Sequence, residues 1–336
     1  MDSFTGCGFV GPVLGVGRSL RDERRIRVRA CTISGHGGTG SGFWSLSEGS
    51  RGRHLAFGIA GSVLALNLAL VPPSEVFAAD EIPASVKDAK EMSKKNTRIT
   101  GQAASIFGAA RKAAEFGDLD TALAKYDELV VAAPTFAGGF SNRANIEVVK
   151  ERYEAAIADY SKSIELAPLS GDTWVVYLNR GSVYNKLQRY EEAIRDYNRA
   201  LELRPEESLV LANRASIYSS RGKWDMALND YRRAVEKKPG NVEPFWLDYA
   251  LALYQRGNTQ ESVGILRRIV AKYPTEPLVR GALAVVLFDR GDLAEAETNW
   301  SMIDRPRTLL DKQYLEDHHW PPKSVEAMRR FKDLKE

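Results

Sequence analysis

Three asparagines recur at one position of three similar segments, and their amides are the side chains best suited to bind a ligand. Asn142 lies in SNRANIEV, Asn179 in LNRGSVYN and Asn213 in ANRASIYS. An amide donates and accepts hydrogen bonds, so a row of amides one repeat apart can hold the backbone of an extended peptide without reading its side chains. The alternative is that asparagine is simply common at this position of the repeated segment, with no ligand implied.

Residues that ordinarily perform catalysis or bind metals are few. Cys7 and Cys31 are too isolated for a disulfide framework or a cysteine zinc site. His318 and His319 are adjacent, so on a helix they would point about 100° apart, and no third ligand is spaced to join them. We find no phosphate-binding loop and no nucleophile motif, and therefore expect no enzyme activity, no metal and no cofactor.

The net charge of +3 belongs to the N-terminal part of the chain. Residues 1–79 hold eight Arg, no Lys and five acidic residues, whereas basic and acidic residues are equal in number from Asp80 onward. A neutral surface offers none of the counterion release on which nucleic-acid binding depends. We therefore expect no nucleic-acid partner.

From about residue 103 the sequence repeats itself with a period near 34 residues. Prolines end successive amphipathic blocks at intervals of 34, 37, 34 and 35 residues. These prolines are Pro134, Pro168, Pro205, Pro239 and Pro274. The blocks read GDLDTALAKYDELVVAAP, ERYEAAIADYSKSIELAP, QRYEEAIRDYNRALELRP, GKWDMALNDYRRAVEKKP, GNTQESVGILRRIVAKYP and, in step, GDLAEAETNWSMIDRP.

Each block carries the residues that let two helices pack closely. Small residues are expected at the helix crossing, at Ala122, Ala156, Ala193, Ala227, Ser262 and Ala296. Larger residues four positions on fill the space between units, at Tyr126, Tyr160, Tyr197, Tyr231, Leu266 and Trp300. Glycines at the turn between the helices favour a left-handed backbone, at Gly117, Gly222, Gly257 and Gly291.

This pattern resembles the tetratricopeptide repeat family. The resemblance implies an all-α fold, an α-solenoid of about six tetratricopeptide helix pairs over residues 103–306 with a C-terminal capping helix in residues 307–336. In that tail Val325, Met328 and Phe331 form an apolar stripe that could close the last repeat. The Lys-rich residues 80–102 are expected to be a linker.

The resemblance also implies a concave groove lined by the first helix of each pair, with Asn142, Asn179 and Asn213 facing it. Groove positions in repeats five and six turn apolar and could hold a hydrophobic partner segment or pack the C-terminal tail. They are Leu247, Leu251, Tyr254, Val285 and Phe288. Family members that clamp the acidic C-terminus of Hsp70 and Hsp90 use Lys and Arg around an Asn. The equivalent positions here are Phe107, Arg111, Val175 and Asn179, so we expect no such carboxylate clamp.

The first 79 residues have the composition of a double targeting signal. Residues 1–54 are rich in Gly, Ser, Thr and Arg and poor in acidic residues, as in a disordered organelle transit peptide. Residues 55–79 follow with a 17-residue apolar run, two prolines and small residues near Ala79, the parts of a secretory-type signal. Together they resemble the bipartite presequences of chloroplast thylakoid-lumen proteins. The alternative is that residues 55–71 remain as a membrane anchor.

Presequence and repeats together resemble a plant family of lumenal tetratricopeptide proteins. The resemblance implies a non-enzymatic scaffold or assembly factor that binds a loop or tail of a photosynthetic complex subunit, with peripheral thylakoid association as a further option. The alternative function is a membrane-anchored adaptor or co-chaperone of a plastid or mitochondrial membrane.

Overall fold

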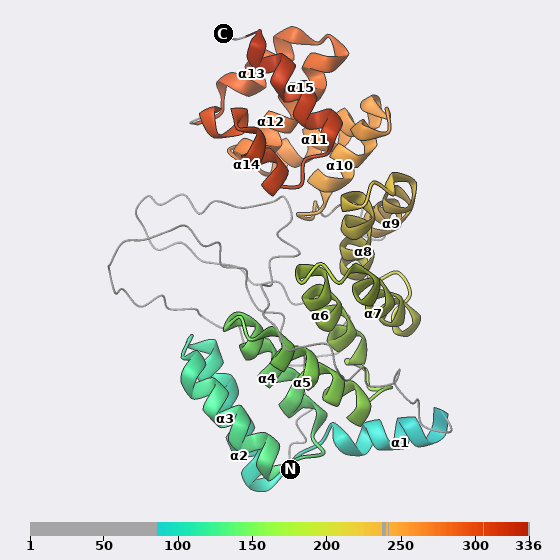
Figure 1. Cartoon of the computed structure of the whole chain (residues 1–336), viewed down its shortest axis with the longest axis vertical. Helices are drawn as coiled ribbons and strands as arrows, with labels where there is room; N and C mark the ends of the chain where they lie inside the picture. Colours follow the sequence, from blue (N-terminus) through green and yellow to red (C-terminus); the bar gives the residue numbers. More distant parts are fainter. Residues whose placement is uncertain (1–85, 237–239, 241, 305, 335–336) are drawn as a thin grey trace. The chain divides into compact units, whose positions relative to one another are not determined.

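The computed structural model describes residues 86–334, apart from 237–239, 241 and 305, and every regular element in that range is a helix (Figure 1). The segments predicted as transit peptide and lumenal signal lie outside the described residues. The described chain forms two compact units, divided inside helix α6 between Arg180 and Gly181.

The first unit begins with α1 (Val86–Asn96) and contains two complete helix pairs. These pairs are α2 (Gly101–Glu115) with α3 (Leu119–Ala132) and α4 (Ala137–Val149) with α5 (Tyr153–Leu166). Helix α6 (Thr173–Lys186) follows and continues into the second unit.

The second unit continues the helix pairs and ends in a folded tail. Its helices are α7 (Tyr190–Leu203), α8 (Ser208–Ser220), α9 (Trp224–Glu236), α10 (Trp246–Gln255), α11 (Thr259–Lys272), α12 (Pro277–Arg290) and α13 (Leu293–Ser301). The tail comprises the 3-10 helix η1 (Pro306–Leu310), α14 (Lys312–Asp317) and α15 (Pro322–Asp333).

The small residues expected at the helix crossings are all completely buried. Ala122, Ala156, Ala193, Ala227, Ser262 and Ala296 each have 0% exposed surface. The large residues one turn later are buried as well, except Trp300, which is half-buried. At Gly181 on α6, a Cβ atom would lie 2.8 Å from the Tyr197 ring, so only glycine fits this contact. The packing pattern predicted from the repeat is confirmed.

Turns between paired helices adopt a left-handed backbone, as predicted. Gly117, Gly222 and Gly257 have φ of 76°, 70° and 88°. In two pairs the turn has no glycine, and Glu151 and Gln188 take the same conformation with φ of 59°. A side chain makes this conformation costly, so these turns store strain that their neighbours must offset.

Part of the stretch expected as a linker, residues 80–102, forms helix α1. Its buried residues Ala89, Ser93 and Asn96 recur at helical spacing, while the lysines lie on the other faces. Asn96 Nδ2 donates to the carbonyl oxygen of Leu166 at 2.8 Å, and Ser93 Oγ accepts from the amide of Leu169 at 3.0 Å. The sequence did not predict this helix because its many lysines obscured the short row of buried residues at helical spacing.

The C-terminal capping helix is α15, and its apolar stripe faces the last helix pairs. Met328 and Phe331 are 2% and 3% exposed, and Val325 packs against the same hydrophobic cluster. The Phe331 ring lies edge-on to Phe288 and Trp300, with ring centroids 5.2 and 5.1 Å away. The predicted cap is confirmed.

Candidate peptide-binding surface

The three predicted asparagines are buried and hydrogen-bonded within their units. Asn142 is 4% exposed, and its Nδ2 donates to the carbonyl oxygen of Gly138 at 2.7 Å. In the same unit Asn179 is 7% exposed and donates to Asn145 Oδ1 at 3.2 Å. In the second unit Asn213 is 2% exposed and its Nδ2 lies 3.4 Å from Ser182 Oγ. Their role in holding a peptide stays a prediction.

Two of these asparagines belong to a repeating polar contact with a buried tyrosine. Tyr160 donates its hydroxyl to Asn145 Oδ1 at 2.6 Å, the atom that Asn179 also contacts. Tyr197 Oη lies 3.2 Å from Ser182 Oγ, which Asn213 contacts in turn. Burial raises the pKa of both tyrosines well above the usual range, so their hydroxyls stay protonated. The amide donors therefore link consecutive first helices inside each unit.

Apolar groove residues predicted in repeats five and six lie beneath the C-terminal helix. Leu247, Leu251, Tyr254 and Val285 are at most 1% exposed, and Phe288 packs on Phe331. All five belong to, or pack against, the hydrophobic cluster that includes α15. Of the two occupants that the sequence left open, the C-terminal tail is the one found here.

Polar contacts hold the tail on the same helices. Lys323 Nζ donates to the carbonyl oxygen of Tyr254 at 3.1 Å and lies 4.1 Å from the centre of its ring. Tyr254 donates its hydroxyl to Asp289 at 2.6 Å, and Arg330 pairs with the same carboxylate at 2.6 Å. These hydrogen bonds help lower the pKa of Asp289, although burial opposes them.

The first helix of repeat one keeps a surface hollow of 350 Å³, which we call the α2 hollow. It is lined by Ala104, Phe107, Gly108, Arg111, Lys112, Glu115 and Phe116. Arg111 lies 5.8 Å above the Phe107 ring and only 3.8 Å from Glu115. Phe116 is 63% exposed, which is unusual for a large aromatic side chain. In the sequence Phe107 and Arg111 were candidates only for a carboxylate clamp, and no motif pointed to Phe116.

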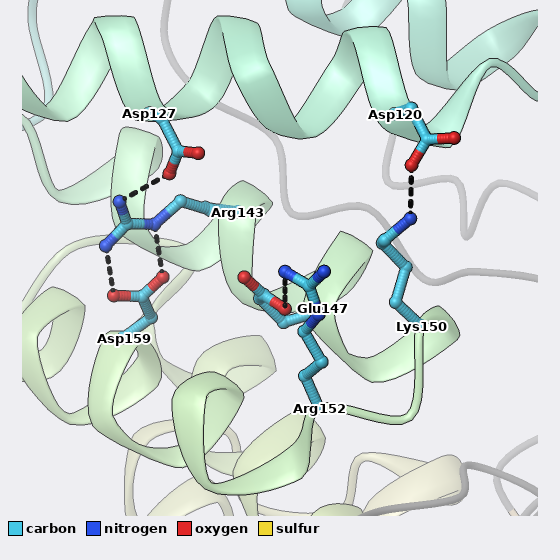
Figure 2. A network of polar contacts seen from close by, with 7 residues as sticks. All are labelled: Asp120, Asp127, Arg143, Glu147, Lys150, Arg152 and Asp159. Atoms are coloured by element: carbon cyan, nitrogen blue, oxygen red, sulfur yellow. Dashed lines mark hydrogen bonds and ion pairs between the residues drawn. The ribbon is translucent and has the colours of Figure 1, made fainter.

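Two arginines next to the repeated asparagines, Arg143 and Arg214, form ion pairs that join neighbouring helices, and Figure 2 shows those of Arg143. Arg143 makes a two-point contact with Asp159 at 2.7 and 2.8 Å and a third with Asp127 at 2.9 Å. Arg214 contacts Asp230 in the same way at 2.7 and 2.8 Å. The segments SNRANIEV, LNRGSVYN and ANRASIYS share an Asn-Arg dipeptide. The arginine of this dipeptide was the sequence signal for these ion pairs.

The remaining contacts of this network also link neighbouring helices and turns. Lys150 pairs with Asp120, and Arg152 Nη1 lies 3.6 Å from Glu147 Oε2, as Figure 2 shows. The hydrogen bond with Asp159 raises the pKa of Arg143, while burial raises the pKa of Glu147. These contacts hold α3, α4 and α5 against one another, which is a structural role.

The adjacent histidines, His318 and His319, lie in the C-terminal tail, at the end of α14 and in the turn that follows it. His318 Nδ1 is 2.6 Å from the carbonyl oxygen of Tyr314, and His319 has a φ of 58°. Burial, followed by the charge of His318, lowers the pKa of His319. In the part of the chain that the structure describes, no three His, Cys, Asp or Glu residues come together as a metal site.

Helices within the described residues are also too short or too polar to cross a bilayer. The apolar run at residues 55–71 lies outside that range, so the choice between a cleaved signal and an anchor stays open.

Models of the tetratricopeptide repeat match residues 174–207 and residues 107–171, 213–277 and 247–300. Together these matches span more than half of the sequence, and the chain belongs to the tetratricopeptide repeat family. The fold class predicted from the sequence, an all-α array of consecutive tetratricopeptide helix pairs, is confirmed. No curated protein gives a significant match.

Two solved structures with TM-scores above 0.5 agree on the fold. A tetratricopeptide repeat protein from Parabacteroides merdae is 20% identical with a TM-score of 0.52, over 68% of this chain and 98% of its own. A chain of the APC/C hetero-tetramer Cut9-Hcn1 is 13% identical with a TM-score of 0.51, over 75% of this chain and 46% of its own. YrrB, described as a tetratricopeptide protein with an unusual peptide-binding site, is 22% identical with a TM-score of 0.44, over 57% of this chain and 94% of its own.

Proposed function

We propose that this protein is a non-enzymatic scaffold or assembly factor that binds an extended segment of a partner protein on the first helices of its repeats. Arrays of helical repeats present such extended surfaces, and proteins of this family generally act as scaffolds. We call the accessible side of the first helices α2, α4 and α8 the first-helix face, taken separately in each unit.

The observation that carries the proposal is the α2 hollow. Its floor includes the buried Phe107 ring, while Phe116 exposes 63% of its surface beside the cations Arg111 and Lys112. An exposed aromatic next to polar groups in a concave surface is typical of a protein recognition site. Partner residues can bury the Phe116 ring while an acceptor approaches Arg111, which lies 3.8 Å from the Glu115 carboxylate.

Capture from native extract tests this surface. The full chain carrying Arg111→Glu and Phe116→Ser is compared with wild type and with Val131→Ser, which changes an apolar residue 81% exposed on α3. We expect wild type and the Val131 variant to recover the same partner and the double variant to lose it. Equal recovery by all three proteins would exclude the α2 hollow as the binding site.

We also propose delivery to the chloroplast thylakoid lumen, with a photosynthetic complex subunit as the partner. The order of an Arg-rich segment, an apolar run, two prolines and small residues supports this address. The alternative is an adaptor or co-chaperone anchored in a plastid or mitochondrial membrane by residues 55–71.

The native N-terminus separates these two locations. Mass spectrometry of fractionated organelles should find a chain that starts near Ala79 or Asp80 in the soluble lumen fraction. A start upstream of Leu55 in a protein that only detergent releases would instead favour the anchored adaptor.

A further inference from the structure

The α2 hollow contains a glycine that the fold itself does not require. Gly108 is exposed in the middle of α2 and does not adopt a left-handed backbone. A Cβ atom at this position would meet no atom within 4 Å, so no close contact calls for glycine here. Glycine inside a helix is destabilising relative to alanine. What Gly108 provides in return is the empty space above α2, which a partner side chain can fill.

The residues around this space are accessible from solvent. Ala104, Gly108 and Arg111 recur at helical spacing and line one face of α2, and the first two leave that face almost bare. At its rim the Phe116 ring is 63% exposed and the Arg111 side chain is 45% exposed. The hollow measures 350 Å³, which is at the lower end of the range for binding pockets and suits one large side chain.

Positive charge is in excess around the hollow. Its charged lining residues are the cations Arg111 and Lys112 and a single carboxylate, Glu115. Arg111 Nη2 lies 3.8 Å from Glu115 Oε1, which is too long for a hydrogen bond, and the guanidinium stays 5.8 Å from the centre of the Phe107 ring. The guanidinium is therefore held at the hollow while it keeps hydrogen-bond donors for a second acceptor.

These features select the chemistry of the occupant. A large apolar side chain above Gly108 would cover the Phe116 ring and remove apolar surface of both partners from water. A carboxylate beside it would accept hydrogen bonds from Arg111 and Lys112. A basic segment would meet two like charges, and a small anion such as phosphate would leave the Phe116 ring exposed.

We propose that the α2 hollow binds an apolar residue and an acidic residue of an extended partner segment. The apolar side chain, a leucine or phenylalanine, lies above Gly108 and against Phe116. The acidic side chain, two positions away, pairs with Arg111 and Lys112, because alternate side chains of an extended chain lie on the same side. This inference rests on the proposed function and adds the chemistry of the partner segment, with Gly108 as the residue that determines the size of the apolar side chain.

A heptapeptide library retained on the immobilised full chain tests the proposal. One position is varied among Ala, Leu and Phe, and the position two residues further among Asp, Glu and Asn. We expect wild type to favour Leu or Phe over Ala by about tenfold, and an acidic residue over Asn by about fivefold. Gly108→Leu should abolish the first preference because its side chain fills the hollow, and Arg111→Gln should weaken the second.

The matched control is Gly264→Leu on α11. Gly264 is also exposed within a helix, and a Cβ atom there would meet no atom within 4 Å. Both leucine variants should raise the urea midpoint because leucine favours the helix more than glycine does. Only Gly108→Leu should lose the retained peptides. Equal retention by the two variants would show that the space above Gly108 binds nothing and would overturn the proposal.

The remaining outcomes separate this proposal from the proposed function. Peptides that the Arg111→Glu and Phe116→Ser double variant loses, but that show no apolar or acidic preference in wild type, would overturn the inference and leave the proposed function intact. An empty library would also overturn the inference, while capture from native extract still decides the proposed function. Peptides that the double variant retains as well as wild type would overturn both. Self-association of the chain that Gly108→Leu abolishes, seen by size-exclusion chromatography, would identify a second copy as the occupant and overturn the inference.

Discussion

Replacing Asp248 by asparagine should stabilise the protein at neutral and alkaline pH. Burial raises the pKa of this carboxyl from 3.8 to about 7. Each pKa unit corresponds to about 1.4 kcal/mol between the two protonation states, so the full shift would amount to about 4 kcal/mol. Because part of the side chain is exposed, water screens the charge, and we expect a gain of about 2 kcal/mol above pH 7.

The sign follows from proton binding. Between about pH 4 and pH 7 the folded chain keeps a proton on Asp248 that the unfolded chain releases, so stability falls as pH rises through this window. Above about pH 7 both states are ionised and this contribution is constant. Asp248→Asn removes this part of the slope.

Urea unfolding followed by far-UV circular dichroism at a series of pH values measures the effect. The asparagine variant should have the higher midpoint at about pH 8 and a flatter profile down to about pH 4. Asp225→Asn, which removes an exposed paired carboxylate, should show no such gain. If Asp248→Asn is no more stable than wild type at about pH 8, Asp248 is not a desolvated, unpaired carboxylate and the reasoning is refuted.

Three further variants test the contacts that build the repeats, each by urea unfolding. Glu151→Gly should stabilise by about 1 kcal/mol because its φ of 59° strains any side chain, whereas Gly257→Ala, with φ of 88°, should destabilise by a similar amount. Effects of the same sign in the two variants would contradict the strain argument. Arg214→Met should cost about 3 kcal/mol because it leaves the Asp230 carboxylate, 3% exposed, without its two-point partner, and adding Asp230→Asn should recover part of that loss; strictly additive effects would deny the coupling. Phe331→Ala should cost about 3 kcal/mol through the lost contacts with the last helix pairs, and an unchanged midpoint would show that α15 does not close the repeats.

Repeat architecture was predictable because its determinants are local in sequence. A small residue such as Ala227 and a tyrosine such as Tyr231, four positions later, identify the helix crossing without any knowledge of the fold. Glycines identified the turns for the same reason. Glu151 and Gln188 were not predicted there, because their side chains show no preference for the left-handed backbone that the neighbouring helices impose.

The candidate surface was less predictable because burial depends on packing between elements distant in sequence. Leu251 and Val285 are apolar whether a partner or the chain's own tail covers them, and only the fold shows α15 in contact with α10 and α12. Asn179 looked like a free amide, but its Nδ2 donates to Asn145 on α4, the first helix of the preceding repeat.

The central claim is that the first-helix face recognises a partner protein, and site-specific photo-cross-linking tests it most directly. A photoreactive amino acid replaces Lys112 in the α2 hollow, or Val131, which is 81% exposed on α3, in the native compartment. The account predicts a discrete cross-linked partner from position 112 and none from position 131. The same adducts from both positions, or none from position 112, would contradict it.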